Sequence, residues 1–141
     1  DRWAGVVAAL LRPGGRLFLR EGHPMLWSID ETRPDGLLVV EHPYFERDEP
    51  IVWDDGGTYV QTDRTFTRNV THEWNHGLGE IVTALLDHGL DLVGLTEHDS
   101  VPWDALPGQM TSDARGEYRL TDRPERLAAT YTLRARKRGE P

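Results

Sequence analysis

The chain contains no cysteine, so disulfide bonds, thiolate nucleophiles and cysteine-ligated zinc are excluded. It also lacks long apolar runs: its longest strongly apolar stretch, residues 6–11, is far shorter than the roughly 20 residues of a membrane-spanning helix. No basic and then apolar leader opens the chain, which favours a cytoplasmic protein. What is left is a chain of 141 residues, the length of one ordinary domain, of which 38% are hydrophobic, enough for a core.

Basic residues are also scarce, with 16 Lys and Arg against 24 Asp and Glu and a net charge of −8. Nucleic-acid binding depends largely on cations that neutralise phosphates, so we expect a small-molecule partner rather than DNA or RNA. The chain starts at Asp1 instead of a methionine, inside a segment with a helical pattern. This start suggests that the 141 residues are a single domain or a fragment of a longer protein.

Two segments, residues 3–11 and 78–86, carry apolar residues at i, i+3, i+4, i+7 and i+8, the spacing of an amphipathic helix. We expect a turn at Gly14 and Gly15 after the first helix, an N-cap at Asn75 for the second helix, and an end to that helix at Gly89. The residues expected to face the core are Trp3, Val6, Val7, Leu10 and Leu11 in the first helix and Leu78, Ile81, Val82, Leu85 and Leu86 in the second.

Three further segments have strand patterns: residues 16–21, 90–96 and 129–137. In the last, Tyr131 and Leu133 alternate with polar residues, which predicts one buried face. Together with the two helices, these strands indicate an α/β frame that comprises residues 1–22 and 75–141.

Residues 23–74 interrupt this frame with a different pattern. Short β segments are predicted at residues 37–40, 51–53, 58–61 and 66–74, separated by clusters of turn-forming residues. We interpret this stretch as a β-rich insertion, or flap, attached to the α/β frame. The residues between the last two frame strands read as a loop with Pro102, Pro107 and Gly108.

Three stretches of the frame, in this order, resemble the C-terminal half of class I S-adenosylmethionine (SAM)-dependent methyltransferases. They are the helix-to-strand turn Leu11-Arg12-Pro13-Gly14-Gly15-Arg16-Leu17, the helix from His76 to Leu90, and the final strand Tyr131-Thr132-Leu133-Arg134-Ala135-Arg136-Lys137. The resemblance implies part of a Rossmann-like sheet in which the last strand is antiparallel and lies between the other two. It also implies methyl transfer from SAM to a small-molecule acceptor.

The chain departs from that family where the cofactor would be held. It has no glycine-rich G-x-G-x-G turn between a strand and a helix, and Gly56-Gly57 and Gly77-Leu78-Gly79 do not follow a hydrophobic strand in a βα unit. We therefore expect no cofactor-binding residues in this chain and weak SAM binding by the chain alone. A non-catalytic binding module derived from the same fold is the alternative.

His23 lies just beyond the first frame strand, at the sheet edge that faces the ligand crevice in open α/β proteins. In the resembling family this position borders the acceptor pocket, so His23 is a candidate general base as well as an acceptor-binding residue. A histidine before a proline is also a common turn residue. Other candidate acceptor-binding residues are His76 and Glu80 at the start of the second helix, and the aromatic residues Tyr44, Trp53 and Trp74, with Tyr59, which would form either a lid or the core of the flap.

A rival interpretation starts from His72-Glu73-Trp74-Asn75-His76, which fits the zinc-hydrolase motif H-E-x-x-H, with Glu97 as a conceivable third ligand. That motif needs both histidines on one face of a helix. Here the preceding residues alternate like a strand, so we predict a structural role and no metal site. A sheet of these three frame strands would leave one edge of the first strand unpaired, which predicts a homodimer or a strand-swapped assembly.

Overall fold

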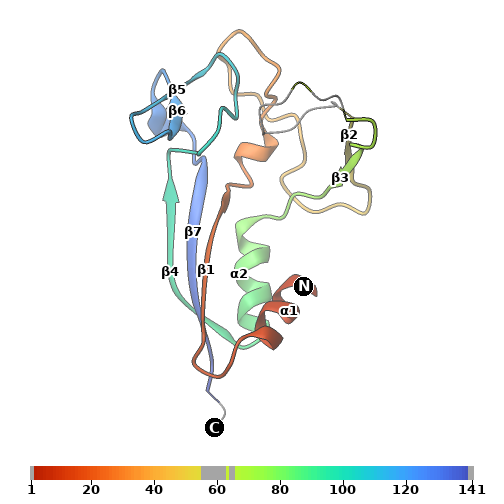
Figure 1. The fold of residues 1–141 in the computed structure, drawn as a ribbon, viewed down its shortest axis with the longest axis vertical. Coiled ribbons are helices and arrows are strands. Elements are labelled where there is room, and N and C mark those ends of the chain that lie inside the picture. The colour runs from red at the N-terminus through yellow and green to blue at the C-terminus, as the bar shows by residue number, and fades with distance from the viewer. Residues whose placement is uncertain (1, 55–62, 64–65, 140–141) are drawn as a thin grey trace.

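The computed structural model describes residues 2–54, 63 and 66–139 (Figure 1). Its helices are α1 (Arg2–Leu10) and α2 (Leu78–Asp87), with 3-10 turns η1 (Leu26–Ser28) and η2 (Pro124–Arg126). Its strands are β1 (Arg16–Gly22), β2 (Ile51–Trp53), β3 (Thr71–Glu73), β4 (Leu90–His98), β5 (Met110–Ser112), β6 (Tyr118–Leu120) and β7 (Thr130–Lys137). The chain is thus a mixed α/β fold, and none of the helices in the described ranges is long and apolar enough to cross a membrane.

The central sheet has the strand order β1-β7-β4. β7 runs antiparallel to both neighbours, so β1 and β4 are parallel to each other. The prediction that the last strand lies between the other two frame strands is confirmed. A register shift between Leu92 and Gly94 bends β4 against β7.

Both long helices lie on one face of this sheet (Figure 1). The small side chains of Ala4 and Ala8 let α1 pack closely against the core beneath it. The expected core stripe of α1 was partly wrong, because Trp3, Val6 and Leu10 are 45%, 52% and 81% exposed. Apolar residues occupy two sides of this short helix, and spacing alone does not distinguish them. The buried core consists of Ala4, Ala8, Ala84, Leu85, Leu90, Tyr131, Leu133 and Ala135.

Each long helix is followed by a turn, and one distant side chain also bonds the last carbonyls of α1. Gly14 and Gly89 take positive φ values of 73° and 79°, as expected for the residues that follow helices. The ammonium of Lys137 in β7 donates hydrogen bonds to the carbonyls of Ala8 and Leu11 at 2.7 and 2.8 Å, and so caps the end of α1.

Asn75 is not the N-cap of α2, contrary to the prediction; Gly77 is. The Asn75 amide instead donates to the carbonyls of Pro24 and Pro43 at 2.8 and 3.1 Å and to the Ser28 hydroxyl at 3.2 Å. The side chain therefore joins the turn at residues 24–28 to the segment at Pro43. A single sequence cannot indicate such a choice, because all three acceptors are distant along the chain.

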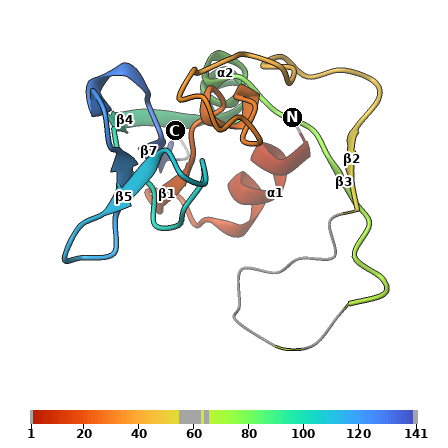
Figure 2. The ribbon, with the colours of Figure 1, turned by 90° about the horizontal axis from the view of Figure 1, so that it is seen from above.

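The insertion holds fewer strands than the pattern indicated. Within its described residues, β2 and β3 are the only strands that pair. Residues 37–40 contribute a single bridge, between Val40 and Ile29, and of residues 66–74 the described part forms a strand only at β3. The predicted strand at residues 58–61 lies outside the described residues. Figure 2 shows the β2–β3 ribbon and the β5–β6 hairpin on opposite sides of the molecule.

Residues 101–129 were expected to be a loop, and this was wrong, because they form a second small core under the β5–β6 hairpin. The apolar residues of this segment are irregularly spaced, so no period reveals them. The core consists of Leu26, Ile29, Val101, Leu106, Leu120, Leu127 and Ala129.

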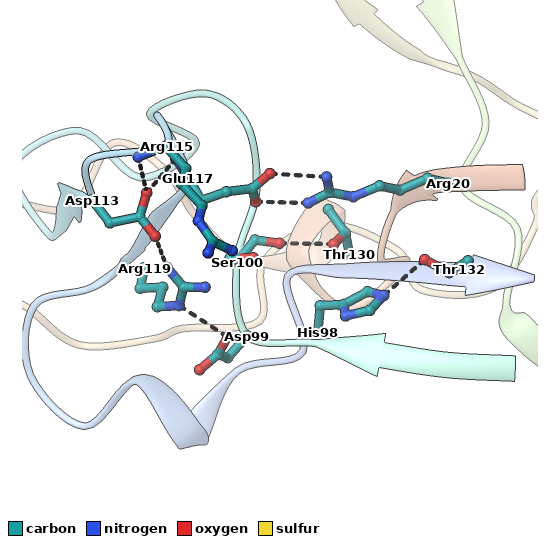
Figure 3. A network of polar contacts seen from close by, with 10 residues as sticks. All are labelled: Arg20, His98, Asp99, Ser100, Asp113, Arg115, Glu117, Arg119, Thr130 and Thr132. Carbon is teal, nitrogen blue, oxygen red and sulfur yellow. Dashed lines mark hydrogen bonds and ion pairs between the residues drawn. The ribbon is translucent and has the colours of Figure 1, made fainter.

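A polar network fastens this hairpin to the central sheet (Figure 3). The guanidinium of Arg20 in β1 donates two hydrogen bonds to the carboxylate of Glu117, at 2.9 and 2.6 Å. The hydrogen bonds from Arg20, with a smaller effect of Ser100, hold the pKa of Glu117 below its ordinary value. Arg119 of β6 in turn pairs with Asp99 and Asp113 at 3.1 and 2.8 Å.

Candidate functional site

The candidate site lies at the end of the central sheet where β1 and β4 finish and β7 begins. There Tyr131 of β7 is directly opposite Glu21 of β1 on one side and Glu97 of β4 on the other. Residues directly opposite in antiparallel strands project to the same face of a sheet. Tyr131 belongs to the core under the helices, so the two carboxylates flank a phenol on the helix-covered face.

A pocket of about 200 Å³ opens at this end, between the sheet and the first turns of both helices. Its walls come from two helices, two strands and the approach to α2, which brings together residues from the full length of the chain. The lining residues are Trp3, Leu19, Glu21, His76, Glu80, Ile81, Ala84 and Tyr131. We call this the sheet-end pocket.

Tyr131 is the most deeply placed polar residue of the sheet-end pocket. The residue as a whole is 1% exposed, and within the described part of the chain its hydroxyl makes no hydrogen bond. That oxygen is not sealed in the core, because no buried side-chain oxygen or nitrogen of the described residues lacks a partner. Burial, with the nearby Glu21 carboxylate as the second cause, raises the pKa of Tyr131 to about 12. The phenol is therefore protonated at neutral pH and can both donate and accept a hydrogen bond. The sequence pattern indicated only that Tyr131 is a core residue. What marks it as a site residue is its register opposite Glu21, which the pattern does not give.

His23 is buried beside this pocket with both ring nitrogens engaged. Its Nδ1 accepts the backbone N–H of Met25 at 3.0 Å, which assigns the proton to Nε2, and Nε2 lies 2.9 Å from Oε1 of Glu97. The imidazole also meets the Tyr131 ring edge-on, at 6.2 Å between centroids. While both bonds persist, the ring has no free lone pair with which to take a proton from a substrate.

His76 and Glu80, both predicted to bind the acceptor, line the sheet-end pocket together. Nδ1 of His76 lies 2.9 Å from Oε1 of Glu80, one helical turn away, and 3.8 Å from Oε2 of Glu46. One ligand atom from each of these three residues lies within 4.8 Å of the other two, a mixed nitrogen and oxygen set of the kind that could hold a divalent ion such as zinc or manganese. The same contacts form a simple ion pair when His76 is protonated.

The H-E-x-x-H motif does not form the helix that a zinc hydrolase requires. His72 lies in β3, and His76 lies in the connection that precedes α2. Because one histidine lies in a strand and the other in an irregular connection, they do not share a helical face. Of the strand expected at residues 66–74, the structure forms the three residues of β3.

The aromatic residues of the insertion do not converge on the sheet-end pocket. Tyr44 accepts the N–H of Leu78 at 3.3 Å and lies against Gly77, so it supports the start of α2. Trp53 and Trp74 instead line a neighbouring depression of about 330 Å³. Tyr59 lies outside the described residues.

A larger depression of about 500 Å³ is lined by Trp53, Trp27, His42 and other residues of the connecting segments and of the β2–β3 ribbon. None of its described lining residues comes from the central sheet or from α1 and α2. The sheet-end pocket is the better candidate site because it lies at the carboxyl ends of parallel strands, where open α/β sheets bind ligands.

No protein-family model matches this chain, and no curated protein shows significant sequence similarity to it. Among solved structures, the chain is similar to a Listeria monocytogenes protein whose assignment as an S-adenosylmethionine-dependent methyltransferase is itself provisional. The two share 16% sequence identity at a TM-score of 0.56, over 96% of this chain and 53% of the other. The chain therefore spans about half the length of that protein, and at this identity the similarity extends to the fold alone.

Proposed function

We propose that these residues form the acceptor-binding side of a class I SAM-dependent methyltransferase that acts on a small molecule. The observation that carries the proposal is the position of β7, which runs antiparallel between two mutually parallel strands. The similarity in fold to a protein with a provisional methyltransferase assignment agrees with the proposal. In this proposal β1, β7 and β4 are one end of a Rossmann-like sheet.

The residues of this chain do not fit the cofactor. A dinucleotide or SAM site of this fold class uses a glycine-rich turn between a strand and a helix, whose backbone amides approach the ligand closely. In the described residues, α2 follows a three-residue strand and an irregular connection, and Gly79 already lies within the helix. We assign no cofactor contact to this chain.

The chain's own residues would bind and orient the acceptor. Glu21 and Glu80 can accept hydrogen bonds, and the Tyr131 hydroxyl can donate or accept one, at the wall of a pocket closed by apolar side chains. Positioning of this kind contributes much of the rate in two-substrate reactions, because it replaces a collision with a bound geometry. In the proposed enzyme His23 positions Glu97, and its role as a base stays a prediction.

The test is methyl transfer by the full-length protein that contains these residues. The protein would be incubated with SAM labelled in its methyl group and a panel of small amines, alcohols and carboxylic acids, and the products identified by mass spectrometry. We expect transfer to at least one class of acceptor, reduced at least tenfold by Glu80→Gln and unchanged by His72→Ala. A full-length protein that binds small molecules but shows no calorimetric binding of SAM would contradict the proposal and support the non-catalytic binding module.

A further inference from the structure

Two of the polar side chains that line the sheet-end pocket are carboxylates. Glu21 and Glu80 line it, and no Lys or Arg is among its described lining residues. Each carboxylate uses only Oε1 in the fold: Glu21 accepts the N–H of Gly22 at 3.0 Å, and Glu80 contacts His76 at 2.9 Å. The second oxygen of each makes no hydrogen bond within the described residues, so two acceptors remain for a ligand.

Tyr131 provides a second, independent observation. Its side chain is almost completely buried, yet its hydroxyl has no hydrogen-bond partner in the described part of the chain and lies at the pocket wall. No buried side-chain nitrogen or oxygen atom of the described residues lacks a hydrogen-bond partner, so the unbonded hydroxyl is open to the pocket, where a ligand can take the place of water. Glu21, Glu80 and Tyr131 thus present three oxygen atoms from β1, α2 and β7.

The remaining walls are apolar and aromatic. Trp3 and Tyr131 contribute rings, while Leu19, Ile81 and Ala84 contribute aliphatic surface. An ammonium group is attracted both to carboxylates and to aromatic faces, and a primary ammonium offers three N–H donors. The volume of about 200 Å³ is below that of pockets for drug-sized ligands, which restricts the ligand to a few heavy atoms.

We propose that the sheet-end pocket binds a small primary ammonium with a short apolar or aromatic group, held by Glu21, Glu80 and Tyr131. The ligand's role as a methyl acceptor rests on the proposed function, whereas its binding does not. A divalent metal at Glu46, His76 and Glu80 is the competing occupant. That cluster would leave Tyr131 and Glu21 without a ligand, so the ammonium accounts for more of the site.

Isothermal titration calorimetry of the full-length protein with benzylamine and its neutral analogue benzyl alcohol tests this inference. At neutral pH benzylamine is protonated, and we expect it to bind at least tenfold more tightly than the alcohol. Glu21→Gln, Glu80→Gln and Tyr131→Phe should each weaken benzylamine binding about tenfold, equivalent to about 1.4 kcal/mol. Glu125→Gln, on the exposed 3-10 turn η2, is the matched control and should change nothing.

Equal affinity for the alcohol and the amine, no binding of benzylamine, or unchanged binding in all three variants would overturn the inference. Stoichiometric binding of Mn²⁺ or Zn²⁺ that is lost in His76→Ala and excludes benzylamine would also overturn it, in favour of the metal. Methyl transfer to alcohols alone would sink the ammonium inference and leave the proposed function intact. Tight benzylamine binding without SAM binding would contradict the proposed function and leave the ammonium inference intact.

Discussion

The imidazole of His23 donates its Nε2 proton to Oε1 of Glu97 at 2.9 Å, and this bond joins the loop after β1 to the end of β4. The histidine side chain is 7% exposed and the glutamate side chain 55%. His23 therefore depends on the bond more than Glu97 does, because a buried polar group that loses its hydrogen bond costs more free energy than one that water can reach.

His23→Ala should destabilise the protein by about 1–3 kcal/mol, because it leaves the N–H of Met25 without its acceptor and removes a buried ring. Urea denaturation would measure the change, with His72→Ala, on an exposed strand, as the control. The role of His23 as a base makes a different prediction: a large loss of methyl transfer without loss of stability. If that pattern is found, the structural role is refuted.

Gly22→Ala should destabilise the protein by about 1–3 kcal/mol through overpacking. A Cβ at this position would lie 2.6 Å from Nε1 of Trp27, and the indole cannot move away easily because it stacks on Trp103 at 5.7 Å. Gly79→Ala is the matched control, since nothing lies within 4 Å of its added Cβ and it lies in α2. The control should gain about 0.5–1 kcal/mol from helix propensity, and equal effects of the two changes would contradict this packing.

Glu117→Gln should cost about 0.5–1 kcal/mol at neutral pH, the upper range for a partly exposed ion pair with bidentate geometry. Since Arg20 lowers the pKa of Glu117 in the folded state, the pair stabilises the fold above the ordinary glutamate pKa of about 4.3 and is lost as the pH falls through the lowered value. The difference between wild type and variant should therefore shrink below about pH 4. Thermal melts of both proteins across this pH range would measure the difference. A difference in stability that grows on acidification would contradict the lowered pKa of Glu117. Asp122→Asn, in an exposed pair, is the control.

Tyr131→Phe should leave stability at neutral pH within about 0.5 kcal/mol, because no described residue bonds to the hydroxyl. The pKa of Tyr131, raised to about 12 by burial and by Glu21, predicts a change at high pH. The stabilising effect of the protonated phenol is complete below about pH 10, the pKa of tyrosine in the unfolded chain. It is lost as the pH rises from there to about 12, because the unfolded chain releases the proton first. Wild type should thus lose stability more steeply than the variant near pH 11 in urea titrations, and parallel losses would refute the raised value.

The free edge of β1 predicts self-association. In the central sheet β1 pairs only with β7, so within the described residues its other edge offers unpaired backbone groups. We expect a protein that consists of residues 1–141 to sediment as a dimer or larger assembly. A monomer at all concentrations would exclude pairing through this edge.

Much of the α/β frame was predictable because each of its elements carries a local pattern. The turn at Gly14 and the helix end at Gly89 follow from residues that favour positive φ, and the strands follow from short apolar runs. Residues 101–129 were missed because their apolar residues pack with Leu26 and Ile29, which are distant along the chain, and have no period of their own.

The candidate site was predictable only in part. His76 and Glu80 were identified because they lie one helical turn apart at the start of a predicted helix. Tyr131 and Glu21 were not, because a strand pattern indicates which face a residue takes but not which residue it lies opposite. Trp53 and Trp74 were assigned to the acceptor site on composition, and the path of the insertion places them in another depression.

The amino-acid sequence by itself determined the two helices, the three frame strands, the acidic charge and the absence of thiol chemistry, since these depend on neighbours along the chain or on composition. Only the tertiary structure decided that Tyr131 lies between Glu21 and Glu97, that both ring nitrogens of His23 are engaged, and that the Asn75 amide bonds three distant acceptors. The physical reason is that strand register and buried hydrogen bonds are properties of the whole packed chain, in which contacts between distant residues outweigh local preference.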